Sequence, residues 1–505
     1  MISNKKHFIY NLLSSYANTI IASVLSFVSV PIALNYWGNE VYGIWTVLTT
    51  FSTYIMASGL GIDSSTALLM TKNSSMSIKA SILKKGFRLL IFCSIVAACL
   101  ITLLTFVYPD WFRIIGKMDE VNYPVAKLSA LIFVIGIIIN LPFSAVANSL
   151  QAFGKAYIGS LINTLQSILT FCSILLTVAF KFSLPFYILI ISCNTIFCSL
   201  FKSTIVWITI HKIPKDNKEI QEKSKDNHYK TILKMGFNMS LYGFALLIIP
   251  NISNLLISNK IDVASLVPYS LSYKLFSIIV TFVYSTNIAL SPLLGTEFGK
   301  NNWEWLKTTY KKMFIISVSL GIFVILGVIW LSKPFIWLWT GNIENYAGIK
   351  ISIILGLYFF IMILSNVNQV IINAFNYTNK VWIISWCDGF IFIITSICLI
   401  KKFGVVSVPV GLCLGALLVS SWAYPLIIYK RSEKRFLYDF RYLIKNLICF
   451  CISVSIYLFI TYLNFSIALT TILYFVGMLI TTFVIFLILP HEFRNALVMK
   501  FRRTK

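Results

Sequence analysis

The chain has 505 residues, of which 58% are hydrophobic and only 12% are charged. A soluble globular protein is about half apolar and roughly a quarter charged, so this composition excludes an ordinary soluble domain. The apolar residues come in runs of about 20, the length at which a helix crosses a hydrocarbon layer roughly 30 Å thick. The sequence therefore predicts an all-α, multi-pass membrane protein, in line with its mean hydropathy of +0.84.

The charge balance is strongly basic, because 42 Lys and Arg outnumber 17 Asp and Glu for a formal charge of +25. In a soluble protein this excess would suggest a nucleic-acid partner. In a membrane protein, loops that face the anionic cytoplasmic leaflet carry excess Lys and Arg, so we expect no nucleic acid. The ten cysteines all lie in apolar runs without a CxxC pair and are interpreted as small buried hydrophobes.

Fourteen apolar segments are candidate membrane spans. They lie near residues 8–34, 41–60, 86–107, 127–151, 157–180, 184–210, 235–258, 265–290, 313–331, 351–376, 382–400, 405–429, 443–463 and 467–489. If the N-terminus is cytoplasmic, the inside segments carry about 31 Lys and Arg and the outside loops about 9. This asymmetry predicts that both termini are cytoplasmic. The first span is interpreted as retained, because its apolar stretch is too long for a signal peptide.

One long polar segment after the sixth span mixes both charge signs and is interpreted as a cytoplasmic linker. The chain also repeats a short pattern, since SLQAFGKAYIGSLIN (149–163) and IINAFNYTNKVWIIS (371–385) both place an Ala-Phe turn and a Lys before a new span. Parallel repeats of this kind are typical of secondary transporters. The predicted organisation is a six-helix lobe at 1–211, the linker at 212–234, a second six-helix lobe at 235–430, two extra helices within 431–490 and a basic tail at 491–505.

Catalytic and nucleotide-binding motifs are missing from the sequence. It contains no GxxxxGK[ST] motif, and its four His lie in or at predicted cytoplasmic loops. No predicted outside loop exceeds about 20 residues, the scale of an ordinary connection. We therefore expect no catalytic residue, no metal site and no cofactor.

The eighth span has a lysine near its centre. Ser270, Lys274, Ser277, Thr281 and Tyr284 recur at steps of four and three residues, which aligns them along one helix face. An ammonium at this depth costs roughly 3 kcal/mol on insertion scales, so it should face the bundle interior or a water-filled cavity. The alternative is a lysine that snorkels or pairs structurally with a neighbouring helix.

The eleventh span holds a carboxylate well inside the predicted membrane, Asp388. The tenth span carries Asn366, Gln369 and Asn373, and a short turn joins the two spans, so Gln369 and Asp388 should lie at similar depth. A carboxylate beside amide oxygens can take H⁺ or Na⁺. A carboxylate held neutral by packing, or bonded to a neighbouring helix, explains the pattern equally well.

Other polar residues have simpler interpretations. Asn18 belongs to a polar stripe on the first span, where Ser and Asn usually serve helix packing. Lys202 lies toward the cytoplasmic end of the sixth span and is expected to snorkel. Asp63 follows the second span at the predicted boundary and is expected to act as a structural cap. Aromatic residues near the outside ends predict an interfacial belt, with stacking on sugar rings as the alternative.

Several stretches resemble a known family. Residues 31–73, PIALNYWGNEVYGIWTVLTTFSTYIMASGLGIDSSTALLMTKN, are similar to the first helical hairpin of polysaccharide exporters of the multidrug/oligosaccharidyl-lipid/polysaccharide (MOP) superfamily. Residues 270–314, 373–380 and 401–415 resemble the eighth span and the tenth to twelfth spans of that family. The similarity extends over residues 8–430, and within the family the chain looks most like Wzx-type flippases of O-antigen and other surface-polysaccharide repeat units.

The resemblance implies two pseudo-symmetric, MATE-like lobes around a central cavity. It implies transfer of an undecaprenyl-diphosphate-linked oligosaccharide between the leaflets of a bacterial inner membrane, by alternating access coupled to an H⁺ or Na⁺ gradient. A polysaccharide polymerase and a chain-length regulator are the implied partners. The chain departs from the usual pattern at spans thirteen and fourteen, which resemble the extension of fourteen-span lipid II flippases.

These considerations predict two sites. The expected substrate site consists of Lys274, which would attract the diphosphate, together with Ser270, Ser277, Thr281, Tyr284, Asn18 and Arg88. The expected ion-coupling site consists of Asp388, Gln369 and Asn366. The alternatives are a lipid II-type flippase, a drug or metabolite antiporter of the same fold, and a membrane-embedded polymerase or ligase, which would normally present a sizeable outside loop.

Overall fold

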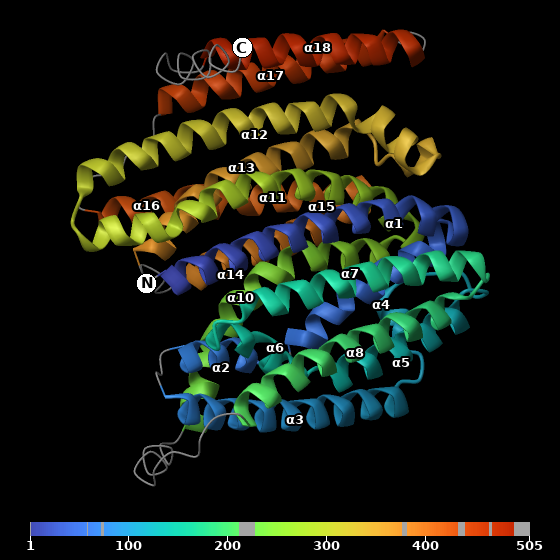
Figure 1. Ribbon diagram of the computed structural model, residues 1–505. Helices are drawn as coiled ribbons and strands as arrows, with labels where there is room; N and C mark the ends of the chain where they lie inside the picture. The colour runs from blue at the N-terminus through green and yellow to red at the C-terminus, as the bar shows by residue number, and fades with distance from the viewer. Residues whose placement is uncertain are drawn as a thin grey trace. The chain divides into compact units, whose positions relative to one another are not determined.

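A computed structural model describes residues 2–57, 59–71, 75–211, 228–375, 381–432, 440–463 and 467–488. These residues form helices and short connections, and no strand occurs among them (Figure 1). Nine helical segments in the described ranges are long and apolar enough to cross a membrane. The all-α, polytopic class is therefore confirmed, whereas the number of fourteen crossings stays a prediction. The basic tail and most of the predicted linker lie outside the described residues.

The helices follow the predicted spans in chain order. The first half contains α1 (Ile2–Ala57), α2 (Ile62–Thr71), α3 (Met76–Val107), α4 (Phe112–Ile115), α5 (Tyr123–Asn140), α6 (Phe143–Ala152), α7 (Ala156–Ala179), α8 (Leu184–His211) and α10 (His228–Lys260). The second half contains α11 (Val263–Gly299), α12 (Trp303–Thr340), η1 (Ile343–Asn345), α13 (Ile349–Ala374), α14 (Val381–Phe403), η2 (Gly404–Val406), α15 (Ser407–Gly415), the π-helix η3 (Ala416–Ser420), α16 (Ser421–Arg431), α17 (Phe440–Tyr462) and α18 (Ile467–Ile488).

Glycine and proline divide two of the long helical stretches. The first two predicted spans form one element, α1, whose helical backbone is interrupted at Gly38 with φ 73° and ψ 177°. Glycine adopts this conformation without the steric cost that a Cβ would add. The fourth predicted span is split into α5 and α6 around Pro142, which has no N–H to donate.

The chain forms two compact units, Met1–Val267 and Pro268–Lys505. In the first unit, α1 packs against α5, α7 and α10, while α8 packs against α5, α6 and α7. The helix α10 thus packs with the first unit, although its residues follow the polar linker at which the sequence drew the boundary between lobes. The predicted lobe boundaries stay a prediction.

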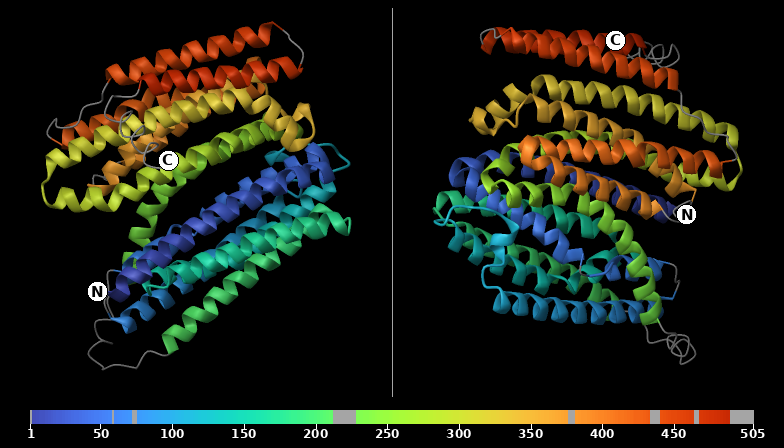
Figure 2. Two further views of the ribbon diagram at one scale, coloured as in Figure 1. Left: turned by 45° about the horizontal axis from the view of Figure 1, so that its top comes forward. Right: turned by 180° about the vertical axis from the view of Figure 1, so that it is seen from behind.

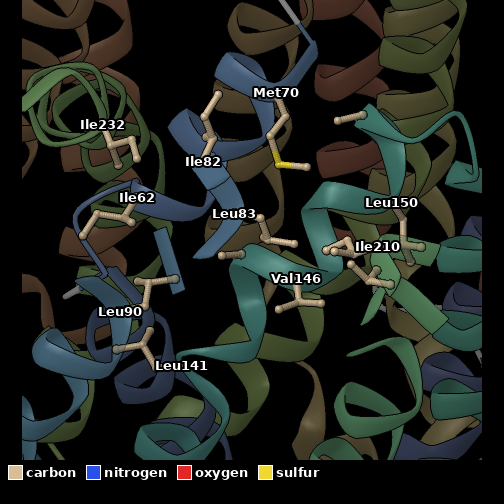
Figure 3. Packing of buried hydrophobic residues seen from close by; sticks show 13 residues of the cluster. Ile62, Met70, Ile82, Leu83, Leu90, Leu141, Val146, Leu150, Ile210 and Ile232 are labelled. Atoms are coloured by element: carbon tan, nitrogen blue, oxygen red, sulfur yellow. The ribbon is translucent and has the colours of Figure 1, made fainter. Parts of the chain in front are cut away.

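A hydrophobic cluster joins five helices of the first unit (Figure 3). Its labelled members are Ile62, Met70, Ile82, Leu83, Leu90, Leu141, Val146, Leu150, Ile210 and Ile232. Complete burial of one such side chain stabilises a water-soluble fold by roughly 1.5–3 kcal/mol, and in lipid the gain comes mainly from close packing. Beside the cluster, Gly61 and Gly236 let α2 and α10 approach, because a Cβ on Gly61 would lie 2.6 Å from the Gly236 carbonyl oxygen.

In the second unit, α17 and α18 form a hairpin that packs along α12 (Figure 2). Trp330 of α12 is completely buried there, and its ring centroid lies 5.2 Å from that of Tyr457 and 5.8 Å from that of Tyr474. The Trp330 indole donates a hydrogen bond to Ser453 at 3.0 Å. Gly477 leaves room for the indole, since a Cβ at that position would lie 2.2 Å from the ring. The hairpin is therefore an integral part of this unit.

Candidate transport site

The carboxylate of Asp388 is buried in the second unit and is 7% exposed. It accepts hydrogen bonds from the backbone N–H of Ser420, at 3.3 Å, and from the Ser420 hydroxyl. A carboxylate without donors at membrane depth would cost several kcal/mol. The two hydrogen bonds from Ser420 therefore offset part of the cost of burying Asp388. Ser420 is the last residue of the π-helix η3. Single π turns inside α-helices often occur at functional sites.

Small residues bring the π-helix to the carboxylate. A Cβ on Gly415 would lie 2.7 Å from the backbone oxygen of Asp388, and one on Gly411 would lie 2.2 Å from the hydroxyl of Ser396. Both glycines belong to α15 and face α14. The close contact of these two helices thus depends on the absence of side chains at two positions, and it places Ser420 next to Asp388.

A tyrosine connects Asp388 to the tenth predicted span. Tyr424 of α16 is 1% exposed, and its hydroxyl lies 3.3 Å from that of Ser385. It also hydrogen-bonds the Gln369 side chain and interacts electrostatically with Asp388. The structure therefore brings Gln369 and Asp388 into one polar cluster, which we call the Asp388 cluster: Asp388, Ser420, Tyr424, Ser385 and Gln369.

Asn366 lies in a different contact. Its side-chain oxygen accepts a hydrogen bond from Asn287 of α11 at 3.1 Å, and Asn287 also donates to Ser317 of α12 at 3.1 Å. All three side chains are buried. Because Asn366 faces α11 and α12, it connects three helices, and no hydrogen bond of the described residues joins it to the Asp388 cluster.

The predicted substrate residues of the eighth span lie on α11. Ser270, Lys274 and Tyr284 are half-buried, whereas Thr281 is exposed. Ser277 donates to the Lys274 carbonyl at 2.9 Å, and Thr281 donates to the Ser277 carbonyl at 2.8 Å. The hydroxyl protons of Ser277 and Thr281 are thus donated to the backbone of their own helix. Toward a ligand, these two hydroxyls could act only as acceptors.

Two buried tyrosines, Tyr269 of α11 and Tyr358 of α13, were not among the residues predicted from the sequence. Next to Tyr358, the ring of Phe359 lies 5.1 Å from that of Tyr273 of α11. The predicted substrate helix thus contacts α13 through aromatic side chains. The sequence contains a signal for such residues, because the hydroxyl of a tyrosine in the middle of a span usually needs a hydrogen-bond partner.

The remaining predicted substrate residues belong to the first unit. Asn18 accepts a hydrogen bond from Thr164 of α7 at 3.2 Å, which agrees with its interpretation as a packing residue. Arg88 is exposed on α3. No hydrogen bond among the described residues joins Asn18 to Arg88, so the structure does not link these two residues of the first unit directly.

Two expectations for charged residues are wrong. Lys202 does not snorkel, because it is 7% exposed and its ammonium donates to Asn163 at 2.6 Å. Asp63 lies in the first turn of α2, after the helix start, and accepts a hydrogen bond from Asn148 of α6 at 2.8 Å. It links two helices instead of capping one. In both cases a polar partner on a neighbouring helix, which the sequence does not show, decides the role.

Comparison with known proteins identifies the fold. Residues 239–397 match the MatE family model. The structure is similar to a lipid II flippase, MurJ, in an inward closed conformation, with a TM-score of 0.66, 15% identity, and coverage of 95% of this chain and 99% of that one. It is also similar to a multidrug resistance MATE family transporter of the MOP superfamily in an inward-facing conformation, with a TM-score of 0.62, 15% identity, and coverage of 83% and 99%.

Together these similarities show a helical fold shared with proteins of the MOP superfamily, in agreement with the resemblance found in the sequence. A curated relative from Salmonella typhi, named "Putative O-antigen transporter", is 23% identical over 434 residues, which cover 83% of this chain and 96% of the relative. A protein of the same name from Salmonella typhimurium is 24% identical over 217 residues, covering 42% and 49%.

Proposed function

We propose that this protein is a flippase that moves a diphosphate-linked oligosaccharide of undecaprenol from the cytoplasmic to the outer leaflet of a bacterial inner membrane, with both termini in the cytoplasm. The observation that carries the proposal is the similarity to a relative named for O-antigen transport along nearly its whole length. The MurJ-like fold supports it, since that neighbour is named a lipid II flippase. Transport without catalysis, and without a resident cofactor, is part of the proposal.

The physical problem of such a transporter is the polar head group. Each polar group left unsatisfied in hydrocarbon costs several kcal/mol, so an unaided flip of an oligosaccharide is prohibitively slow. A hydrated path removes this cost for the head group while the lipid chain stays in the bilayer. In the proposed mechanism Lys274 attracts the anionic diphosphate, and hydroxyl and aromatic groups of α11 contact the sugars.

The Asp388 cluster is the proposed coupling site. Its carboxylate is held by Ser420 at a close contact of α14 and α15, so a change in its charge acts directly on that contact. The driving gradient is one of H⁺ or Na⁺. Asn366, which was expected in this site, would act on it only through the packing of α13 against α11 and α12.

Two other substrates are compatible with the same fold. The hairpin of α17 and α18 and the MurJ-like structure favour a lipid II-type substrate as the second candidate. A drug or metabolite antiporter is the third, because MATE transporters share the fold. A polymerase and a chain-length regulator of polysaccharide assembly are the proposed partners of the first candidate.

Deletion and complementation test the proposal. Loss of the gene should abolish a surface polysaccharide without sensitising the cell to drugs, and Lys274→Ala should fail to restore the polymer although the protein reaches the membrane in normal amount. Lys401→Ala is the matched control, because Lys401 is exposed at the end of α14. A deletion strain with normal polymer and new drug sensitivity would establish the antiporter instead.

A further inference from the structure

A seam of polar side chains runs between α7 and α8 of the first unit. These helices lie side by side (Figures 1 and 2). Four hydrogen-bonded pairs form the seam: Lys155 with Thr209 at 3.0 Å, Lys202 with Asn163 at 2.6 Å, Gln166 with Thr195 at 3.2 Å, and Asn194 with Ser173 at 2.8 Å. Both helices are apolar enough to cross a membrane. Uncharged polar pairs at such a contact usually serve helix packing, whereas an ionisable residue among them points to a function.

Lys202 is the buried charged residue of the seam. Its ammonium donates to the side-chain oxygen of Asn163, and no ion pair among the described residues includes it. A buried charge without a counter-charge is strongly destabilising unless other groups compensate for it. Asn163 is itself exposed, so the buried nitrogen is one side chain away from the surface of the unit.

The surroundings of Lys202 contain few titratable groups. On α8 the nearest is Cys198, one turn away, which interacts with it electrostatically. On α7 Tyr157 and Cys172, and Lys155 just before its start, lie more than one turn from Asn163, and α6 carries no titratable residue. On α5 Tyr123 and Lys127 lie in the first two turns, where Lys127 is 3.9 Å from an Asp110 oxygen. No carboxylate of these helices therefore fixes the charge of Lys202.

The position of Lys202 has a counterpart in the second unit. The repeated Ala-Phe turns lie at the ends of α6 and α13, where Ala152 and Ala374 are the last helical residues. The same separation along the chain pairs first-unit residues with members of the Asp388 cluster: Asn163 with Ser385, Gln166 with Asp388, Cys198 with Ser420, and Lys202 with Tyr424. Each unit thus keeps a buried residue that is charged at neutral pH at the equivalent helix contact, an amine in the first and a carboxylate in the second.

The Asn163 side chain can serve both charge states of an amine. The ammonium donates to its oxygen, as observed. A neutral amine has a lone pair, which can accept from the NH₂ group of the same amide once the amide turns over. A carboxylate partner would stabilise the ammonium form of the lysine much more than the neutral amine. An amide partner can hydrogen-bond both forms, which is what a lysine that changes its charge requires.

We propose that Lys202 is a second ion-coupling group, which exchanges one proton with water that reaches it past Asn163. One N–H bond of the ammonium breaks, the proton passes to water, and the amine retains the electron pair; the reverse step restores the ammonium. The coupling role rests on the proposed transport function, but the proton exchange does not. It places a proton-binding step in the first unit, separate from the Asp388 cluster.

Lysine side-chain NMR of the full protein in nanodiscs tests the proton exchange without any substrate. With ¹⁵N-labelled lysine, the Lys202 resonance is the one missing in Lys202→Met, a variant that should fold because replacing a buried charge by an apolar side chain is often neutral or stabilising. Lys84→Met, at an exposed position of α3, controls for general effects. The Lys202 signal should change reversibly from ammonium to amine at a pH below about 10.4, the reference pKa of a lysine ammonium in water. An ammonium signal at every pH up to this value would overturn the proposal.

A transport assay then tests the coupling. In proteoliposomes with a fluorescent polyprenyl-diphosphate oligosaccharide as probe, Lys202→Met should still equilibrate the probe, but the proton uptake per probe should fall by about one proton. An unchanged proton count would refute the coupling role of Lys202. If the wild-type protein does not move the probe at all, the proposed function fails, and the NMR titration still decides whether Lys202 exchanges its proton.

Discussion

Two helices at corresponding places in the repeat, α3 and α12, show how the two units differ. In the most apolar 18-residue stretch of α3, 11% of the residues are buried, against 67% for α12. Phe92 and Phe106 of α3 are 65% and 85% exposed, whereas Trp330 of α12 is fully buried beneath the hairpin of α17 and α18. The burial of α12 therefore comes partly from α17 and α18, in addition to its packing against α13.

The same comparison separates packing from charge. The seam between α7 and α8 corresponds to the contact of α14 with α15 and α16, yet the first contains the amine of Lys202 and the second contains the carboxylate of Asp388. A polar contact thus lies at the corresponding pair of helices in each unit. The charge of its ionised residue differs, since it is positive for Lys202 and negative for Asp388. Variants made in matched pairs, one in each unit, test this difference between the units.

The largest effect is expected for Trp330→Ala. It removes a fully buried indole and its hydrogen bond to Ser453, and large-to-small changes of this kind cost about 3–5 kcal/mol in protein cores. The thermal unfolding temperature in detergent should fall by several degrees. Phe92→Ala on α3 is the control and should change stability by less than about 0.5 kcal/mol. Equal losses in both variants would show that the hairpin does not stabilise α12.

The next largest effect is expected for Asp388→Asn, measured as gradient-driven transport. An asparagine still accepts the Ser420 N–H bond, so the fold should survive, but the site loses its charge. Coupled transport should fall by about 100-fold, which corresponds to roughly 2.7 kcal/mol. The matched variant is Gln166→Asn in the first unit, which removes no charge and should leave transport within about twofold. If the two variants behave alike, Asp388 is a packing residue.

A smaller effect is expected for Gly415→Ala. The added Cβ would lie 2.7 Å from the Asp388 backbone oxygen, so α15 must move away from α14. Overpacking of this kind costs typically about 1–3 kcal/mol. Gly299→Ala is the control, because no atom lies within 4 Å of a Cβ there. Thermal unfolding measures the cost, and a neutral result at Gly415 would mean that the contact adjusts freely.

The sequence predicted the helical architecture well, because a membrane span must satisfy its backbone hydrogen bonds internally and therefore leaves a long apolar run. It also predicted that Gln369 and Asp388 come together, since a short turn between two helices fixes their relative depth. Both inferences use local geometry, which a single chain segment determines.

The sequence did not predict contacts between distant segments. The partners of Asp388 and Lys202, Ser420 and Asn163, lie 32 and 39 residues away on other helices. The π-helix η3 has no signal in its sequence, ALLVS, since it arises where α15 packs on α14 across glycines. Asn366 forms its hydrogen bond with Asn287 of α11, which is likewise a contact between distant segments that the sequence does not show.

The smallest effect is expected for Glu297→Gln, in the last turn of α11. The Lys300 ammonium, 2.7 Å away, and the Asn302 amide hold the pKa of the Glu297 carboxyl below its usual range. A lowered pKa stabilises the fold above the unfolded value of about 4.3, and this contribution disappears as the pH falls through the folded pKa. Glu297→Gln should therefore lower the unfolding temperature slightly near pH 7 and not at all near pH 3, and salt should weaken the difference because the pair is exposed.

The corresponding turn of the first unit, before α3, contains the uncharged pair Ser75 and Ser77, whose hydroxyls lie 2.8 Å apart. Ser75→Ala should show no dependence on pH or salt, since neither partner titrates. We expect the change in unfolding temperature to depend on pH for Glu297→Gln and not for Ser75→Ala. The two units would then differ in charge at these turns as well as at their buried helix contacts. No loss at either pH would assign the role of Glu297 to the hydrogen bond with Asn302, because a glutamine side chain also accepts from that amide.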